Sequence, residues 1–267
     1  AMVKLDRPEE ARELVEEAAR IAPKDYYVRF QLGAVLLDAG QADQALEHLQ
    51  EAASKEPDNA EFRYYLGRAY LNTGHISEAI HHYLEAVNGA PLKHQWQAEL
   101  GEIYLREHAY VPALEHLRLA AQLEPGEPVY RYNLAIAQAS NGDLQAALYT
   151  LREALRTFGD FAGAEWYYLE GKLLTENGRL DEALESFVRA NHMEPGNPDY
   201  KVDLAKVLRL KGAPVDRVRP LLDEALTEDP ESLRAYEELA YTLEQSNQDE
   251  AAVQTLEARI NEVLSKV

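Results

Sequence analysis

One stretch decides the fold: residues 62–91 read FRYYLGRAYLNTGHISEAIHHYLEAVNGAP. A Leu-Gly pair at 66–67 is followed by Ala at 79, an aromatic residue at 83, Ala at 86 and Pro at 91. The same order recurs 34 residues earlier and 34 residues later, with Leu in place of the aromatic residue. A fixed period of this length indicates an array of one small structural unit.

Copies of this unit account for nearly the whole chain. We expect residues 1–7 to be a cloning remnant with a disordered start, and residues 8–267 to form one array. The array divides into a half repeat, 8–25, and seven repeats, 26–59, 60–93, 94–127, 128–161, 164–197, 198–232 and 233–267. Each repeat reads as two helices joined at a short turn, and most repeats end at a proline.

Small residues recur inside the predicted helices. Gly67 and Gly101 each lie in the middle of a first helix, where glycine costs about 1 kcal/mol relative to alanine. Their recurrence indicates that the missing side chain lets the paired second helix come close. Ala79 has the same role on the second helix, and the large Tyr83 fills the space beside it. An all-α fold of antiparallel helix pairs follows.

The first helix of the 164–197 repeat departs from the pattern. Tyr167-Tyr168-Leu169-Glu170-Gly171 aligns with Tyr64-Tyr65-Leu66-Gly67 only if one residue is extra. Either Glu170 takes a position that elsewhere is leucine, or the helix carries a one-residue bulge, a feature often found at functional sites. We favour a local adjustment without function.

Composition excludes several classes of function. The formal net charge of −20 argues against nucleic acid and anionic lipid as partners, because both require Lys and Arg. It leaves two interpretations open, a basic partner or a solvated surface that keeps the array soluble. The chain has no cysteine, which excludes disulfides and thiolate metal sites, and no apolar run long enough to span a membrane.

The pattern Leu-Gly-x-x-Tyr, followed by Ala, an aromatic residue or Leu, Ala and Pro, resembles the tetratricopeptide repeat. The resemblance covers about residues 8 to 267. It implies a right-handed superhelical solenoid of antiparallel helix pairs, with the first helices lining a concave groove. Members of this family are mostly scaffolds that hold peptides or other proteins in that groove.

The resemblance also implies which residues face the groove. They fall on Tyr27, Phe30, Tyr64, Arg68, Asn72, Arg106, Tyr132, Asn133, Tyr168, Lys172, Lys206 and Arg209. Four aromatic residues share the fifth position of their repeats: Phe30, Tyr64, Tyr132 and Tyr168. Tyrosine is frequent at recognition surfaces because it gives large contact area and a hydroxyl at low entropic cost. In the 60–93 repeat, packing alone does not require Tyr64, Arg68 or Asn72.

One branch of the family grips acidic chaperone tails with Lys and Asn at fixed groove positions. Asn133 matches the middle element of that clamp. The flanking repeats offer Ala98 and Glu102 on one side and Glu165 and Leu169 on the other. Chaperone-tail binding is therefore not expected.

No catalytic or metal site is expected. His48, His82 and His116 occupy the same position in three consecutive repeats, so they lie one repeat apart and not around one ion. No metalloprotease, P-loop, dinucleotide or nucleophile-elbow motif occurs. We predict no enzyme activity and no cofactor.

The leading hypothesis is a non-catalytic scaffold that binds a protein or peptide partner in its groove. A basic partner is one of the two interpretations that the net charge leaves open. The alternatives are self-assembly into a homo-oligomer through the array ends, or a regulatory domain of a larger enzyme. Neither nucleic acid binding nor membrane insertion is expected. A cytoplasmic location is the first expectation and a periplasmic location the alternative.

Overall fold

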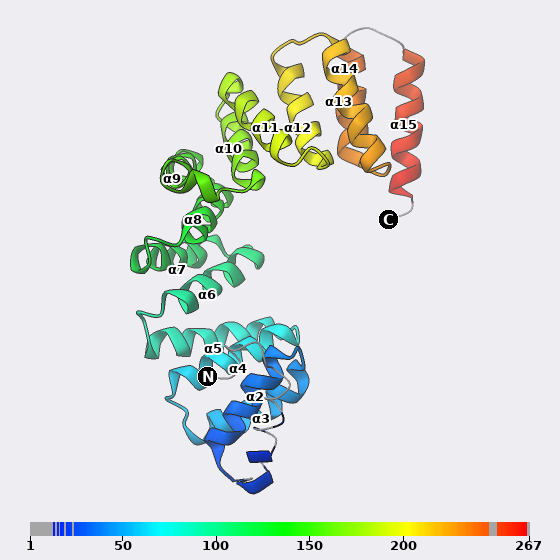
Figure 1. Ribbon diagram of the computed structural model, residues 1–267. Helices are drawn as coiled ribbons and strands as arrows, with labels where there is room; N and C mark the ends of the chain where they lie inside the picture. Colours follow the sequence, from blue (N-terminus) through cyan, green and yellow to red (C-terminus); the bar gives the residue numbers. More distant parts are fainter. Residues whose placement is uncertain are drawn as a thin grey trace. The chain divides into compact units, whose positions relative to one another are not determined.

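The computed structural model describes residues 13–265, except residues 14, 16, 19, 23 and 246–249. The described residues form fourteen α-helices and one short 3-10 turn, and no strand among them (Figure 1). The expected cloning remnant at 1–7 and most of the half repeat at 8–25 lie outside the described residues. The predicted all-α solenoid is confirmed.

The chain separates into two compact units, which we call unit 1 (residues 1–134) and unit 2 (residues 135–267). Unit 1 contains α2 (Tyr26–Asp38), α3 (Ala42–Lys55), α4 (Ala60–Asn72), α5 (Ile76–Gly89), α6 (His94–Arg106), α7 (Tyr110–Leu123) and the first part of α8 (Pro128–Ser140). Unit 2 contains the rest of α8, α9 (Leu144–Phe158), the 3-10 turn η2 (Gly159–Phe161), α10 (Ala164–Glu176), α11 (Leu180–Met193), α12 (Pro198–Leu210), α13 (Val215–Glu228), α14 (Leu233–Gln245) and α15 (Glu250–Leu264). The sequence-based division into a single array stays a prediction.

Helices that follow one another in sequence pack in pairs. In unit 1 the pairs are α2 with α3, α4 with α5 and α6 with α7, and in unit 2 they include α10 with α11 and α12 with α13. First helices of adjacent repeats also contact one another, as α2 does α4 and α12 does α14. We call the surface that these first helices share the first-helix face of each unit.

Where the structure describes the turn inside a repeat, that turn contains a residue with left-handed backbone. Gly74 holds this position in the 60–93 repeat, with φ of 80°. His108 holds it in the next repeat, with φ of 57°, a conformation that is strained for a residue with a Cβ. The repeat geometry therefore dictates the backbone even where the sequence lacks glycine.

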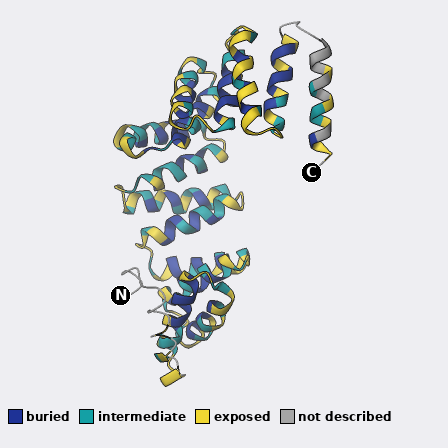
Figure 2. Cartoon of the chain, turned by 45° about the vertical axis from the view of Figure 1, so that its right-hand side comes forward, coloured by how far each residue is buried: buried dark blue, intermediate teal, exposed yellow. Residues whose placement is uncertain are grey.

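Close contact between paired helices holds each repeat together. A Cβ built on Gly67 would lie 2.9 Å from the Tyr83 ring, and one on Gly101 would lie 2.6 Å from Cγ of Leu117. The partner alanines are fully buried, Ala79 and Ala113 among them. In Figure 2 the buried residues line the faces where paired helices meet. The glycines and alanines therefore let the paired helices come close, as predicted.

Glu170 occupies the leucine position in a regular helix. Helix α10 is continuous from Ala164 to Glu176, as long as the other first helices, and Gly171 contacts Phe187 as Gly67 contacts Tyr83. A bulge would have shifted Gly171 out of this contact. The first of the two alternatives for this helix therefore holds.

Replacing Gly171 by alanine is expected to destabilise unit 2 by about 1–2 kcal/mol, because overpacking outweighs the gain in helix propensity. The new Cβ would lie 2.7 Å from a carbon of the buried Phe187 ring, which would have to shift. Urea unfolding followed by Trp166 fluorescence, in a Trp96→Phe background, measures the change. Gly196→Ala is the matched control, since nothing lies within 4 Å of its added Cβ. Equal stability of the two variants would contradict the packing role.

Candidate functional site

Tyr64 on α4 is built into the packing of unit 1. Its ring stacks on Trp96 of α6 at 4.6 Å, and its hydroxyl donates to the Glu99 carboxylate at 2.7 Å. Tyr83 donates to the other oxygen of Glu99 at 2.6 Å. Burial raises the pKa of Tyr64, and the adjacent carboxylate raises it further. The expectation that packing does not require Tyr64 was wrong, because only the neighbouring repeat reveals its partners.

The same link recurs in unit 2. The Tyr168 hydroxyl donates to the buried Asp203 carboxylate of α12 at 2.5 Å, and Arg234 of α14 donates to that carboxylate at 2.8 Å. Burial raises the pKa of Tyr168, and its hydrogen bond to Asp203 adds to the effect. The fifth-position tyrosine of one repeat therefore binds a carboxylate at the sixth position of the next.

Phe30 is a core residue rather than a groove residue. Only 2% of its surface is exposed, and its ring stacks on Phe62 at 4.4 Å and meets Tyr65 edge-on at 5.2 Å. A partner cannot reach a ring covered in this way. Of the four fifth-position aromatics, Phe30, Tyr64 and Tyr168 thus serve contacts between repeats, while Tyr132 on α8 is half-buried.

The remaining predicted residues of unit 1 stay closer to the surface. Tyr27, Asn72 and Arg106 are exposed. Arg68 lies 3.6 Å from the Asp38 carboxylate, and its guanidinium lies over the rings of Tyr64 and Tyr65. These contacts orient Arg68 without burying it.

The Glu102 carboxylate on α6 accepts a hydrogen bond from Asn133 and feels the charge of Arg106. The Asn133 amide donates to Glu102 at 2.7 Å, and the exposed Arg106 lies one helical turn further along. Burial raises the pKa of Glu102 above its ordinary value of 4.5; the Arg106 charge opposes this rise and the Glu99 charge adds to it. The first-helix face of unit 1 therefore holds a partly buried carboxyl, and the nearby Arg106 and Asn133 do not fully offset the effect of burial on its pKa.

In unit 2 the predicted residues Lys172 and Lys206 line one small pocket. It has a volume of about 120 Å³, and its walls come from α10, α11, α12 and α14. The lining residues are Lys172, Thr175, Glu176, Phe187, Asp203, Lys206, Val207 and Arg234. The Lys172 ammonium also lies 5.6 Å from the centre of the Tyr168 ring. The structure thus brings Tyr168, Lys172 and Lys206 together around Asp203.

Most other cations of this face are already paired. Arg209 binds the buried Glu238 of α14, and Lys201 binds Glu228 at 2.6 Å. Arg234 binds Asp203 and Asp199. Among the residues that the structure describes, Lys172 and Lys206 are exposed and have no carboxylate partner.

Sequence reasoning missed the buried acids Asp203 and Glu238 and the half-buried Glu99. A charged residue in an acidic chain reads as a surface residue unless its partner is known. One signal was present: an acid follows the fifth-position tyrosine by 35 residues in both Tyr64–Glu99 and Tyr168–Asp203. Because 35 is one repeat plus one residue, that spacing brings neighbouring first helices together.

The histidines are explained by packing and pairing. His82 and His116 stack on Tyr70 and Tyr104 at 5.4 and 5.7 Å, and burial lowers the pKa of both imidazoles. His81, His82 and Glu85 could hold a metal within the described residues, with ligand atoms within 4.8 Å of one another.

That cluster already contains a cation. The Arg63 guanidinium lies 3.2 Å from the Glu85 carboxylate and 3.4 Å from Nδ1 of His82. A metal ion would have to displace this charge, so we assign no metal to the cluster.

Replacing Glu102 by glutamine is expected to stabilise unit 1 at neutral pH. A carboxyl with a raised pKa binds its proton more tightly in the folded state, so stability falls as pH rises from 4.5 through the folded pKa. Glutamine removes the desolvated charge and keeps an oxygen for Asn133. The unfolding midpoint should rise at pH 7, and the difference should shrink below pH 4.5, followed by Trp96 fluorescence in a Trp166→Phe background. Glu107→Gln, at an exposed site, is the control; an equal or smaller effect of Glu102→Gln would contradict the assignment.

Two family models match the chain. The model of the cytochrome c-type biogenesis protein H TPR domain matches residues 133–265, and a tetratricopeptide repeat model matches residues 36–100. No curated protein matches the chain in sequence. Among the described helices, none is long and apolar enough to cross a membrane.

Solved structures share the fold at low identity. The chain is similar to YrrB, a TPR protein with an unusual peptide-binding site, at 19% identity and a TM-score of 0.58, over 70% of this chain and 95% of that one. It is also similar to MamA from Desulfovibrio magneticus RS-1, at 19% identity and a TM-score of 0.59, over 64% of this chain and 95% of that one. A tetratricopeptide repeat protein from Parabacteroides merdae is similar at 16% identity and a TM-score of 0.60, over 90% of this chain and 94% of that one. Taken with the repeat pattern and the helix pairs, these matches show that the chain belongs to the tetratricopeptide-repeat family.

Proposed function

We propose that this protein is a non-catalytic scaffold that binds an extended segment of a partner protein on its first-helix faces. Tetratricopeptide repeats are generally scaffolds of this kind, and YrrB carries a peptide-binding site. The observation that carries the proposal is the pocket of unit 2, where Lys172 and Lys206 are exposed and no described carboxylate forms an ion pair with either of them.

These two lysines suit a partner carboxylate. Their neighbours Arg209, Arg234 and Lys201 are held by protein acids, so they have less charge to offer a ligand. An unpaired ammonium beside a pocket can form a charge-assisted hydrogen bond, which is about twice as strong as a neutral one. We therefore assign an acidic side chain of the partner to the pocket of unit 2.

Unit 1 offers the opposite charge. Glu102 is half-buried beside Glu99. A basic group of the partner would stabilise the ionised Glu102 carboxylate and so offset the cost of its burial. A basic partner, one of the two interpretations that the net charge of −20 left open, is our proposal for unit 1. Tyr27, Asn72, Arg106, Tyr132 and Asn133 are its proposed contact residues, and Arg68 orients the face.

Lys206→Glu is expected to weaken binding of a glutamate-rich peptide about tenfold, the cost of one lost charge-assisted contact. Fluorescence anisotropy with labelled extended peptides of equal length, rich in Glu, Lys or Gln, measures the affinities. Arg217→Glu, at an exposed site on the second helix α13, makes the same change in net charge. Equal loss in the two variants would show that only the overall charge matters and would contradict the site.

A narrower second candidate is a role in the biogenesis of c-type cytochromes. It is favoured by the family model of the cytochrome c-type biogenesis protein H TPR domain, which matches nearly all of unit 2. Deleting the gene in its source organism should then reduce covalently bound haem, detected by peroxidase staining of denaturing gels. Unchanged staining would contradict this role and leave the scaffold proposal intact.

A further inference from the structure

Three departures from the repeat pattern occur close together in unit 2. Gly159 stands where other repeats end in proline, as at Pro125 and Pro195. Glu170 stands at a leucine position, and Arg189 stands where Glu51, Glu85 and Glu153 occur in other repeats. All three departures line the same surface hollow, although they belong to different elements.

The hollow has a volume of about 480 Å³, within the usual range for ligand sites. It is formed by the end of α9, the turn η2 and parts of α10 and α11. Its lining residues are Arg152, Leu155, Arg156, Thr157, Gly159, Asp160, Tyr167, Glu170 and Arg189. None of them lines the pocket of Lys172 and Lys206, so this is a separate surface.

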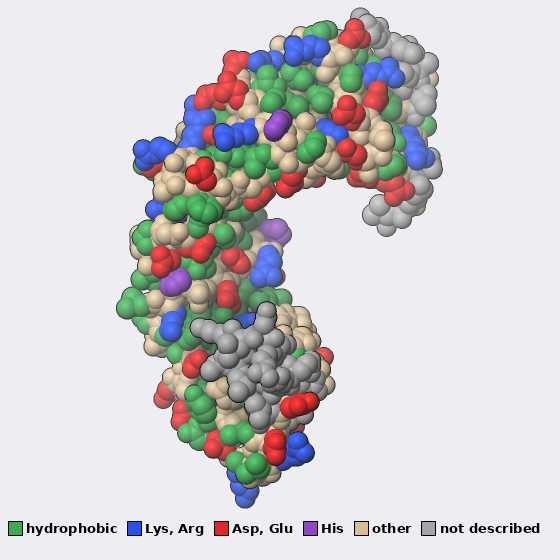
Figure 3. Space-filling view, viewed as in Figure 1, with side chains coloured by type: hydrophobic (Ala, Val, Ile, Leu, Met, Phe, Trp, Pro, Cys, Tyr) green, Lys and Arg blue, Asp and Glu red, His purple; other side chains and the backbone are tan. Residues whose placement is uncertain are grey.

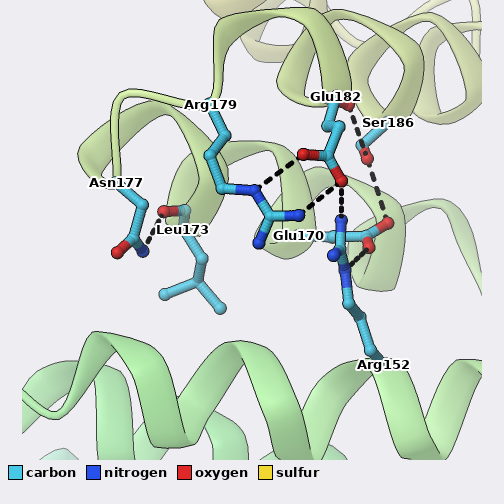
Figure 4. A network of polar contacts seen from close by, with 7 residues as sticks. All are labelled: Arg152, Glu170, Leu173, Asn177, Arg179, Glu182 and Ser186. Carbon is cyan, nitrogen blue, oxygen red and sulfur yellow. Dashed lines mark hydrogen bonds and ion pairs between the residues drawn. The ribbon is translucent and has the colours of Figure 1, made fainter.

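Glu170 fixes one wall of the hollow through Arg152. Figure 4 shows Arg152 reaching from α9 to two carboxylates, Glu170 on α10 and Glu182 on α11, each at 2.8 Å. The second oxygen of Glu170 accepts from the Ser186 hydroxyl at 2.9 Å. A carboxylate in a leucine position is tolerated because it is paired in this way. Because Arg152 is paired with these two carboxylates, Arg156 and Arg189 are the arginines of the hollow that can bind a ligand.

Arg189 is held in place by an aromatic ring. Its guanidinium carbon lies 4.1 Å from the centre of the Tyr167 ring, and Tyr167 is buried. Stacking uses the flat face of a guanidinium and leaves its N–H edge free for a planar or tetrahedral anion. Arg189 has no carboxylate partner among the described residues.

Arg156 and Tyr167 add further donors. Within the part of the chain that the structure describes, the ion pair of Arg156 is with Glu153, one turn away on the surface, where such pairs contribute little. The hydroxyl of the buried Tyr167 makes no hydrogen bond with any residue that the structure describes. A Cβ added at Gly159 would meet only that hydroxyl, at 3.9 Å, so glycine keeps the space above it open.

We propose that this hollow binds an oxyanion group, carboxylate or phosphate, carried by a partner protein. Arg156 and Arg189 supply the charge, and Tyr167 supplies a hydroxyl donor. Asp160, at the rim, repels an anion. The group must therefore contact both arginines, whose charges together outweigh that of Asp160. Phe161, which is 80% exposed beside Asp160, offers an apolar contact to flanking residues of the partner. Figure 3 shows Lys and Arg side chains on the surface around α9 and α10.

The test compares labelled peptides with Glu, phosphotyrosine or Gln at the centre of one apolar sequence. The Glu or phosphotyrosine peptide should bind at least about tenfold more tightly than the Gln peptide. Arg189→Glu restores the residue of other repeats and should abolish this preference, while Arg156→Gln should reduce it. Circular dichroism checks that both variants stay folded. All of these proteins also carry Lys206→Glu, so that the first-helix pocket does not contribute to the preference. Arg217→Glu should then leave the preference intact, which separates this site from an effect of net charge.

Two results would overturn the proposal. One is equal binding of the Gln peptide, or full affinity in Arg189→Glu. The other is competition by inorganic phosphate at the peptide's own concentration, which would mean that a free ion and not a partner protein fills the hollow. Tighter binding of phosphotyrosine than of Glu would support a phosphorylated partner, and the reverse order would support a carboxylate.

Discussion

Every repeat depends on how closely its two helices approach. A small residue of the first helix, glycine or alanine, leaves a gap that a large residue of the second helix fills, as Phe187 does against Gly171. Fully buried alanines such as Ala183 close the rest of the interface. Because the main chains come so near, the helix axes of a pair have little freedom. The positions of the side chains on the first-helix face follow from that constraint.

A second set of contacts joins one repeat to the next. In unit 1 it is the Tyr64 hydroxyl on Glu99, and in unit 2 it is Tyr168 on Asp203. A buried carboxylate is costly unless it is paired, and unit 2 meets that cost with Arg234. The charged groups of this face therefore divide into those that are paired within the array and those that have no carboxylate partner among the described residues. Lys172 and Lys206 belong to the second kind, as Arg189 does elsewhere on unit 2.

The periodic pattern was sufficient to predict the helices, their pairing and the role of Gly67, because these depend on residues within one repeat. The resemblance to the tetratricopeptide repeat implied that Lys172 and Lys206 lie on one face. It failed for Phe30 and Tyr64, whose burial depends on Phe62, Tyr65 and Trp96 in the following repeat. A period shows which positions are equivalent, but not which neighbouring side chain covers each of them. The hollow at Arg189 was invisible for the same reason, since its walls come from two repeats.

The contacts between repeats also bear on how fast the chain folds. Tyr64 and Glu99, or Tyr168 and Asp203, are 35 residues apart, and paired helices are closer still. Contacts this local close only short loops as the chain folds, so we expect a low relative contact order and fast folding. Any helix pair can serve as the nucleus from which order spreads to its neighbours. The hydroxyl–carboxylate bonds are then the steps at which one folded repeat recruits the next.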